Sequence, residues 1–278
     1  MVQSSLKVCQ VETATGVLPA RLVVAHGALG EDVESTTGGL LLVHPKGSYL
    51  VDGGLAESVE EHLAEVPGFM GFAARKSAKD WVSVSRLDDA LRKLGVEPAT
   101  LTGMFPTHGH YDHLGGLLDL PGVPLWMPEA EIEEARRAVA GEGSSILPAD
   151  AALAVARAQP MPLVPAEVGP WSQAWDLFGD GSALVVGMPG HTPGSVGVLV
   201  HLSDGKLFLV GDTVWVREGF EQREPKGVIA GTFDSDQSAT DRQIQWLYQL
   251  YRAEPDVVIL PSHDRRQWAR AFPQPCRE

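Results

Sequence analysis

The sequence predicts an α/β protein, and three observations support this class. Short apolar runs typical of strands alternate along the chain with segments whose apolar residues recur at helical spacing. The chain has 278 residues, of which 44% are hydrophobic, enough for a large core in one domain or in two fused halves. Histidine and aspartate residues follow several of the expected strands directly, and rigid elements often hold functional groups in such loops.

The first half is expected to open with strands and then to alternate strands with helices. A hairpin is predicted because Pro45-Lys46-Gly47 forms a turn between two apolar runs. The expected strands are 21–25, 39–43, 48–52, 101–106 and 123–127, and the expected helices are 57–65, 85–94, 129–140 and 149–159.

A stretch punctuated by four prolines, between residues 160 and 170, is expected to connect two halves, approximately 1–165 and 166–278. In the second half, strands are predicted at 183–187, 196–201, 206–210 and 256–260, and a helix at 238–253. Residues 214–229 are predicted to be a long loop, and the tail from Arg265 is short and contains proline.

The net charge of −14 argues against a nucleic-acid partner, because such partners require a basic face. No apolar run approaches the ~20 residues that a membrane span needs, and residues 1–16 lack the apolar segment of a signal peptide. Cys9 and Cys276 lie near opposite ends, which indicates neither a disulfide framework nor a zinc ribbon. We therefore expect a cytoplasmic protein.

Thr107-His108-Gly109-His110-Tyr111-Asp112-His113 is the most informative stretch, since it places four ligand-type residues in six positions. Imidazole nitrogen and carboxylate oxygen are common ligands of divalent transition metals. The cluster also lies between a predicted buried strand and a glycine-containing turn into a helix. A single histidine here would be unremarkable, but the clustering predicts a metal site.

Similar residues recur at the ends of other predicted strands. Asp52, His191, Asp212 and His263 each follow a strand, as His108 does. Any one of them alone would be interpreted as an aspartate that forms a turn or as a histidine that makes ordinary hydrogen bonds within the fold. Their recurrence predicts that they meet at one edge of the sheets.

With these motifs in place, the chain resembles the metallo-β-lactamase-fold hydrolases from about residue 38 to residue 264. The matching motifs are Asp52, the H-x-H-x-D-H segment 107–113, Gly190-His191-Thr192-Pro193-Gly194-Ser195, Gly211-Asp212-Thr213 and His263. The resemblance implies a single domain over residues 1–278, built as a four-layer αββα sandwich with a dinuclear metal site in a cleft at the sheet edges.

The resemblance also implies roles for individual residues. One metal would be held by His108, His110 and His191, and the other by Asp112, His113 and His263. Asp212 would bridge the two ions, Asp52 would orient ligands through hydrogen bonds, and Asp112 would carry the proton to the leaving group. Two divalent ions are expected, zinc first, with iron and manganese as alternatives.

Within this family, the motifs look most like those of hydrolases of a lactone, ester or thioester, in which a metal-bridging hydroxide attacks the carbonyl. N-acyl-homoserine lactonases are preferred over glyoxalase II-type thioesterases. One departure is Trp215, where the lactonases commonly carry a tyrosine whose hydroxyl holds the substrate carbonyl. Two alternatives remain: an iron-containing persulfide dioxygenase, because the same ligands accept iron, and a degenerate relative that only binds.

The partner expected is a small-molecule substrate, with no nucleic acid and no membrane, and a homodimer is left open. Five aromatic residues are candidates for an apolar pocket that holds an acyl group: Phe69, Phe72, Trp81, Trp215 and Phe220. The alternative, that these rings pack the walls of the cleft, has equal weight.

Overall fold

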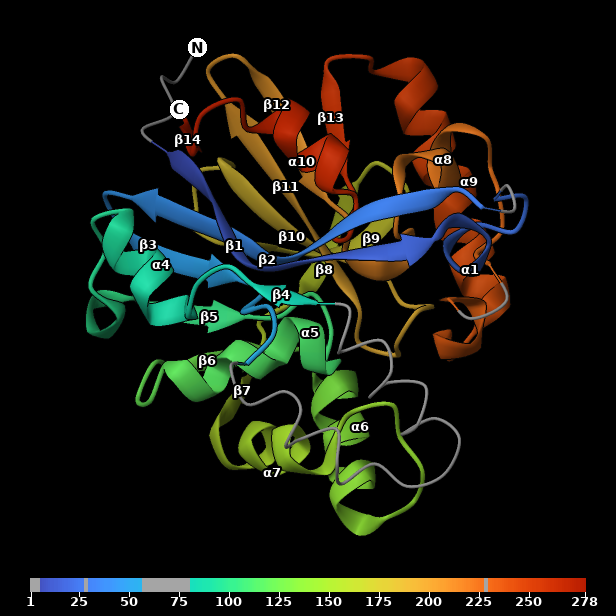
Figure 1. Ribbon diagram of the computed structural model, residues 1–278. Coiled ribbons are helices and arrows are strands. Elements are labelled where there is room, and N and C mark those ends of the chain that lie inside the picture. Colours follow the sequence, from blue (N-terminus) through green and yellow to red (C-terminus); the bar gives the residue numbers. More distant parts are fainter. Residues whose placement is uncertain (1–5, 28–29, 57–80, 228–229) are drawn as a thin grey trace.

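Two mixed β-sheets face each other in the computed structural model, which describes residues 6–27, 30–56, 81–227 and 230–278 (Figure 1). Within these residues the first sheet has the spatial order β14 (Cys276–Arg277), β1 (Lys7–Pro19), β2 (Asp32–His44), β3 (Gly47–Val51), β5 (Gly103–Phe105), β6 (Leu125–Met127) and β7 (Ala158–Pro160), and β4 (Val82–Ser83) pairs with β1. The second sheet has the order β13 (Val257–Leu260), β12 (Gly205–Leu209), β11 (Val196–Leu202), β10 (Ala183–Gly187), β9 (Trp171–Asp176) and β8 (Val164–Val168). Each sheet contains both parallel and antiparallel pairs.

Helices cover the outer faces of both sheets. The described helices are α1 (Ala20–Val23), α4 (Leu87–Lys93), α5 (Tyr111–Leu114), α6 (Glu129–Ala140), α7 (Pro148–Arg157), α8 (Arg217–Glu221), α9 (Gln237–Ala253) and α10 (Arg265–Ala271). Short 3₁₀ turns span Pro98–Thr100, Gly115–Asp119, Gly211–Thr213 and Ala230–Phe233. Helices α4, α6 and α7 share a core with the first sheet, and α9 shares one with the second. The layers therefore follow the αββα order that the resemblance implied.

The period-two alternation of side chains explains why many strands are apolar on both faces. In β2, Leu40 and Leu42 enter the core between the sheets, whereas Leu41 packs under the helices of the first sheet. In β12, Leu207 points between the sheets and Phe208 points toward α9. Each sheet is thus buried on both sides, and its polar groups emerge where the strands end.

Two early elements differ from the sequence prediction. Residues 21–25 were expected to form a strand, but α1 covers Ala20–Val23. This expectation was wrong because Val23 and Val24 pack with Val216 in a small separate cluster, and tertiary contacts override β-propensity in so short a segment. The 13-residue strand β1 was not predicted, since threonine, glutamate and glycine interrupt its apolar pattern.

Three later segments in which no helix or strand was predicted contain regular structure. The proline-punctuated connection includes β8, and β9 begins directly after it at Trp171. Strand β8 tolerates Pro165 because it is the edge strand of its sheet. The predicted loop 214–229 contains α8, and the tail contains α10 and β14. The expected helix at 57–65 lies outside the described residues.

The two cysteines, whose positions near opposite ends of the sequence indicated no disulfide framework, form one disulfide. Cys9 of β1 and Cys276 of β14 are direct partners in an antiparallel pair, and their sulfurs are bonded. Their separation of 267 positions left no local signal of this bond.

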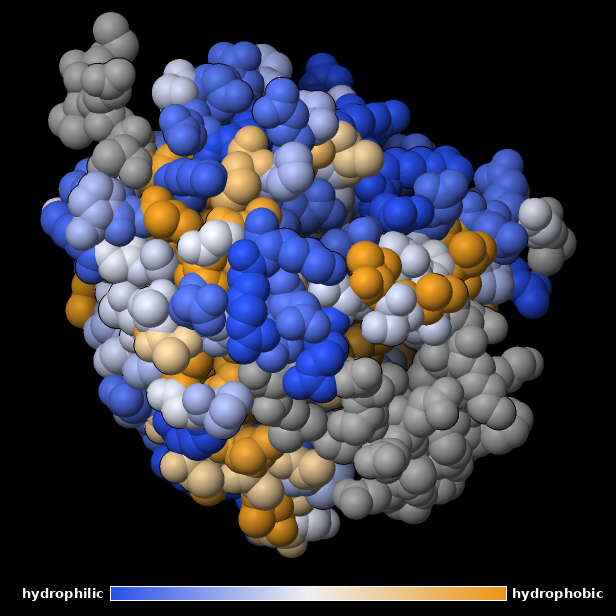
Figure 2. All heavy atoms as spheres, turned by 60° about the vertical axis from the view of Figure 1, so that its left-hand side comes forward, coloured by the Kyte–Doolittle hydropathy of each residue, from blue (hydrophilic) through white to orange (hydrophobic). Residues whose placement is uncertain are grey.

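Polar and apolar residues are mixed over the visible surface (Figure 2). On the face that Figure 2 presents, hydrophilic residues interleave with small groups of hydrophobic ones. Among the residues placed in the structure, no helix combines the length and apolarity needed to cross a membrane.

Candidate metal centre

The predicted site residues lie at one edge of the two sheets, each just beyond the end of a strand. Asp52 follows β3, His108 and His110 follow β5, and His191 follows β10. Asp212 follows β12, and His263 follows β13. Asp112 and His113 lie in α5. Seven of these side chains fall into three overlapping groups, and within each group the ligand atoms lie within 4.8 Å of one another. The convergence at a sheet edge, predicted from their positions, is therefore found in the structure.

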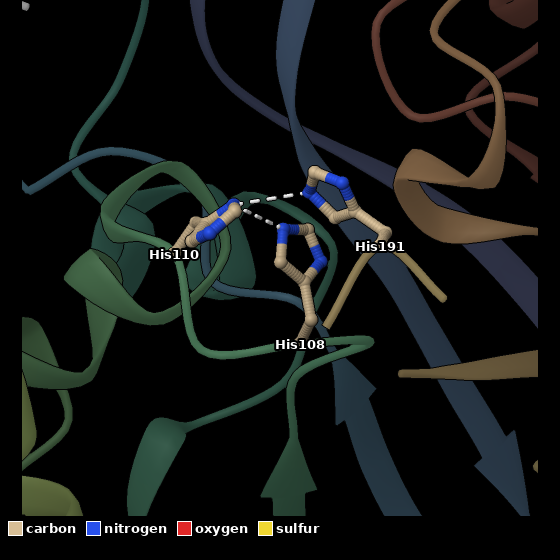
Figure 3. Close-up of side chains that lie close together, drawn as sticks. All are labelled: His108, His110 and His191. Carbon is tan, nitrogen blue, oxygen red and sulfur yellow. Dashed lines mark hydrogen bonds between the residues drawn. The ribbon is translucent and has the colours of Figure 1, made fainter. Parts of the chain in front are cut away.

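The first group consists of His108, His110 and His191, whose rings converge in Figure 3. His110 Nδ1 lies 2.9 Å from His108 Nε2 and 3.1 Å from His191 Nε2. All three side chains are buried. Burial lowers the pKa of His110 to about 3 and holds the pKa values of His108 and His191 well below the usual value. Neutral imidazoles with converging nitrogens are suited to a metal ion.

The second group consists of Asp112, His113 and His263. His263 Nε2 lies 3.4 Å from Asp112 Oδ2, and His113 Nε2 lies 4.0 Å from Asp112 Oδ1. Burial acts to lower the pKa of His113, but the carboxylates of Asp52 and Asp212 raise it well above the usual value. This group therefore differs from the first in that negative charge surrounds its imidazoles.

Asp212 lies between the two groups. Its Oδ1 is 3.2 Å from Nε2 of both His113 and His263, and its Oδ2 is 3.7 Å from His191 Nε2. Burial acts to raise the pKa of this carboxyl, but His263 and His113 hold it well below its usual range. Oδ2 also lies 3.2 Å from His263 Nε2, so both oxygens contact the second group and Oδ2 in addition approaches the first. The carboxylate therefore reaches both groups.

The donor set fits two divalent cations. His113 Nε2 and Asp212 Oδ1 are buried, face each other and have no well-directed hydrogen bond within the described residues. Buried polar atoms without partners are rare and require an explanation. Imidazole nitrogens with carboxylate oxygens form a ligand set that zinc, iron and manganese accept, so the residues present fit a bound cation at this place.

Several neighbouring groups fix the orientation of the ligand rings. Asp52 accepts hydrogen bonds from Thr107 N at 2.5 Å and Thr107 Oγ1 at 3.1 Å, and lies 3.0 Å from His113 Nδ1. Its φ of 60° is unusual for an aspartate and is typical of strained residues at functional sites. The Thr36 carbonyl accepts from His263 Nδ1 at 3.0 Å. Such partners fix both the tautomer and the ring angle.

His191 is oriented by a buried ion pair. Asp234 Oδ1 lies 2.8 Å from His191 Nδ1 and 2.5 Å from Lys226 Nζ, and the ammonium itself lies 3.1 Å from Nδ1. Since His191 Nε2 faces His110, the proton of the neutral ring belongs on Nδ1, where Asp234 accepts it. Burial lowers the pKa of Lys226 and raises that of Asp234, and the charge of each partner opposes this effect on the other. The ammonium and the carboxylate therefore stabilise each other in the charged form.

Aromatic rings surround part of the centre. The Trp215 ring lies 5.3 Å from His263, and Trp81 lies 6.4 Å from the same ring. Phe233 lies 6.0 Å from His110 and 6.3 Å from Trp215. The Trp215 Nε1 atom is buried and has no hydrogen-bond partner among the described residues. These rings supply an apolar wall and one unused N–H donor.

Of the remaining aromatic candidates, Phe220 does not join this wall. Phe220 is 1% exposed and packs at 5.6 Å against Tyr251, in the core beneath α9. Its assignment to the substrate pocket is corrected, because packing between α8 and α9 accounts for its position. Phe69 and Phe72 lie outside the described residues.

Four residues near the centre were not predicted: Glu131, Lys226, Phe233 and Asp234. Glu131 looked like an acidic residue in the first turn of α6, which a helix dipole favours wherever the helix lies. The other three come from the segment between β12 and α9, and no local pattern links them to a histidine some 40 residues earlier. Only the tertiary structure reveals these contacts.

Together, the αββα layers and the paired His/Asp groups at the sheet edge define a metal-dependent hydrolase with a dinuclear site. The family model described as the metallo-beta-lactamase superfamily matches residues 39–263. The chain belongs to this superfamily.

Curated relatives include N-acyl homoserine lactonases. The enzyme AttM of Rhizobium radiobacter is 27% identical over 242 residues, which span 86% of each protein. A lactonase of a Bacillus species is 26% identical over 242 residues, 84% of each protein. A crystal structure of an N-acyl homoserine lactone hydrolase, with N-hexanoyl-L-homoserine at its metal centre, has a TM-score of 0.71 at 19% identity and 99% coverage of both chains. The dizinc lactonase AidC has a TM-score of 0.61 at 16% identity, with 95% of this chain and 89% of its own covered.

Proposed function

We propose that this protein opens the lactone ring of an acylated homoserine lactone or a closely similar small lactone. The observation that carries the proposal is the position of Asp212 between a group of three histidines and a group of one aspartate and two histidines, beside an aromatic wall. Such a site combines a polar centre for the ester with an apolar surface for an acyl chain. The distant relationship to N-acyl homoserine lactonases supports the same substrate class.

We assign the ligands as the resemblance implied. His108, His110 and His191 would hold one ion; Asp112, His113 and His263 would hold the other, and Asp212 would bridge them. Zinc is the first choice of metal. When bound, the two ions supply Lewis acidity toward the carbonyl and lower the pKa of water.

Within this scheme the proton carrier is Asp112. Its side chain is 17% exposed, whereas those of His263 and Asp212 are 4% and 2% exposed. Asp112 is therefore the ligand with the best access to substrate and solvent, and one of its oxygens can receive a proton from water and pass it to the leaving alkoxide.

We propose that Trp215 holds the substrate through its indole N–H. This group is buried and has no hydrogen-bond partner within the described part of the chain, and a carbonyl oxygen of the substrate would give it an acceptor. An indole donates a hydrogen bond but does not act as an acid at neutral pH, so Trp215 positions the substrate without proton transfer. Trp81 and Phe233 would contact the acyl chain.

The first test combines metal content with a substrate panel on one protein sample. We expect about two equivalents of divalent metal per chain, as two-metal hydrolases require, and chelator-sensitive hydrolysis of N-acyl homoserine lactones above thioesters and aryl esters. Turnover of a thioester alone would refute the lactone assignment. A single equivalent of iron without any hydrolysis would refute the dinuclear hydrolase.

The second test uses two isosteric substitutions. Asp212→Asn removes the charge between the two groups and should abolish activity together with the second equivalent of metal. Asp264→Asn is the matched control, because Asp264 is also buried but caps α10 by accepting from Gln267 N at 2.8 Å. We expect the control to keep both metals. An Asp212→Asn protein with two metals and full activity would contradict the bridging role.

Three broader expectations also remain proposals. We propose that residues 1–278 act as a single domain of two halves, that the assembly is either a monomer or a homodimer, and that the protein is cytoplasmic. The Cys9–Cys276 disulfide is an observation against the cytoplasm, where disulfides are rare. Alkylation of thiols in intact cells tests this directly, since a reduced pair supports the cytoplasm and an oxidised pair contradicts it.

A further inference from the structure

We propose that Glu131 is a positioning residue that holds together the two loops carrying His108, His110 and His191. The inference rests on the proposed dinuclear function and adds a residue that none of the metal-binding motifs contains. Glu131 lies in the first turn of α6, and its side chain leaves the helix toward the metal loops.

The carboxylate of Glu131 accepts three hydrogen bonds from two separate loops. Its Oε1 accepts from Gly109 N at 2.6 Å, and its Oε2 accepts from Gly194 N at 2.9 Å and from Thr192 Oγ1 at 2.8 Å. Gly109 stands between His108 and His110, and Thr192 directly follows His191. One side chain therefore fixes the backbone beside all three histidines of the first group.

The close approach of Glu131 also helps to explain why residues 109 and 194 are glycines. A Cβ on Gly194 would lie 2.5 Å from Glu131 Cβ and 2.8 Å from its Oε2. A Cβ on Gly109 would lie 3.0 Å from Glu131 Oε1 and 2.5 Å from Ile146 Cδ1. The loops can approach the carboxylate only because neither residue has a side chain.

A carboxylate suits this position better than any neutral side chain. Glu131 is 0% exposed, so each hydrogen bond lost here would leave a buried donor unpaired. Glutamine has one acceptor oxygen, and its amide NH₂ would face either the Gly109 N–H or the Gly194 N–H. Glutamine therefore preserves the shape but can hold only one of the two loops well.

The second metal group has different anchors. His113 is held by Asp52, and His263 by the Thr36 carbonyl. Release of Glu131 should therefore weaken the first metal before the second. This asymmetry separates a role in positioning the ligands from a general role in the stability of the fold.

The experiment compares wild-type protein with Glu131→Gln and with the matched control Glu134→Gln. Glu134 is on the same helix and pairs with Arg137 at 3.1 Å instead of with a metal loop. For each protein, zinc equivalents are measured after dialysis against a series of free-zinc concentrations, and the melting temperature is measured with and without zinc. We expect Glu131→Gln to bind one of its two zinc ions at least about tenfold more weakly, and to show a smaller zinc-induced rise in melting temperature.

The results separate the two proposals. Two ions bound with unchanged affinity in Glu131→Gln, or an equal loss of melting temperature with and without zinc, would overturn the positioning role. An equal weakening in Glu134→Gln would also overturn it. Fewer than two zinc ions in the wild-type protein would instead refute the dinuclear function on which the inference rests.

Discussion

The buried Lys226–Asp234 pair behind His191 allows stability and metal binding to be separated by mutation. Asp234→Asn keeps the shape of the side chain but removes the charge that lies 2.5 Å from the ammonium. The side chains of Lys226 and Asp234 are 2% and 0% exposed, so the remaining ammonium would be buried without a counter-charge. Breaking such a pair from one side typically costs about 3–5 kcal/mol.

The same substitution weakens the acceptor for His191 Nδ1. Losing the charged partner of a metal-binding histidine typically lowers metal affinity about 10–100-fold, or about 1.4–2.7 kcal/mol. Lys226→Met should have the opposite profile, since it removes the ammonium but leaves the 2.8 Å contact between Asp234 and His191. We expect it to lower stability with little effect on metal affinity.

The double variant Asp234→Asn/Lys226→Met separates the effect on stability from the effect on metal affinity. With both charges removed, the free energy of unfolding, measured by denaturant titration of the metal-free proteins, should recover by at least about 2 kcal/mol relative to Asp234→Asn, because no unpaired charge remains buried. Zinc affinity, measured by competition with a chelator, should stay low because the carboxylate is still missing. Recovery of zinc affinity together with stability would refute a direct role of Asp234 in holding His191.

Three further predictions concern the disulfide, a buried carboxyl and the indole donor. Reduction of the Cys9–Cys276 disulfide should lower the free energy of unfolding by up to about 5.5 kcal/mol, the loop-closure value for a span of this length. A Cys9→Ser/Cys276→Ser variant should not respond to reductant. A midpoint of wild-type unfolding that is insensitive to dithiothreitol would contradict this prediction. Burial, with the charge of Asp112 adding to it, raises the pKa of Asp150 from 3.8 to about 7. The folded state thus keeps this proton up to about pH 7, whereas the unfolded chain loses it near pH 4, so the free energy of unfolding falls as the pH rises between these values. Asp150→Asn should therefore stabilise the protein at pH 8, by up to about 4 kcal/mol, but not at pH 4. Equal effects at both pH values would contradict the shift. Trp215→Phe should leave stability nearly unchanged, because the N–H has no hydrogen-bond partner among the residues that the structure describes. The substitution should lower kcat/KM about tenfold through one missing hydrogen bond to the substrate; unaltered kinetics would exclude the donor role.

Much of the architecture could be predicted because strand ends, turns and helix faces leave local patterns. The strands before His108, His191, Asp212 and His263 were expected close to where they occur, so the sheet edge that assembles the metal centre followed from the sequence. The missed strands β1 and β8 lack such patterns. β1 mixes buried threonine with apolar residues, and β8 carries a proline that only an edge strand accepts.

The supporting residues of the site could not be predicted, because their roles depend on distances between segments far apart in sequence. Glu131 contacts Gly194 across 63 positions, and Asp234 contacts His191 across 43. For Phe220 the error was the reverse, because the sequence suggested a role in the site that the structure does not support. An aromatic residue in a predicted loop near Asp212 was a reasonable candidate for the pocket, but the loop contains α8, which turns this ring into the core.

The contact between Glu131 and the two glycines also limits how this sequence can diverge. A Cβ at position 194 would lie 2.6 Å from the backbone N of Glu131 and 2.5 Å from its Cβ, and a Cβ at position 109 would lie 2.5 Å from Ile146 Cδ1. Neither close approach depends on the carboxylate itself, so both glycines are required even where residue 131 is no longer glutamate. Relatives that keep this packing should therefore retain glycine at 109 and 194 while position 131 varies. Libraries built to alter substrate preference should keep both glycines fixed.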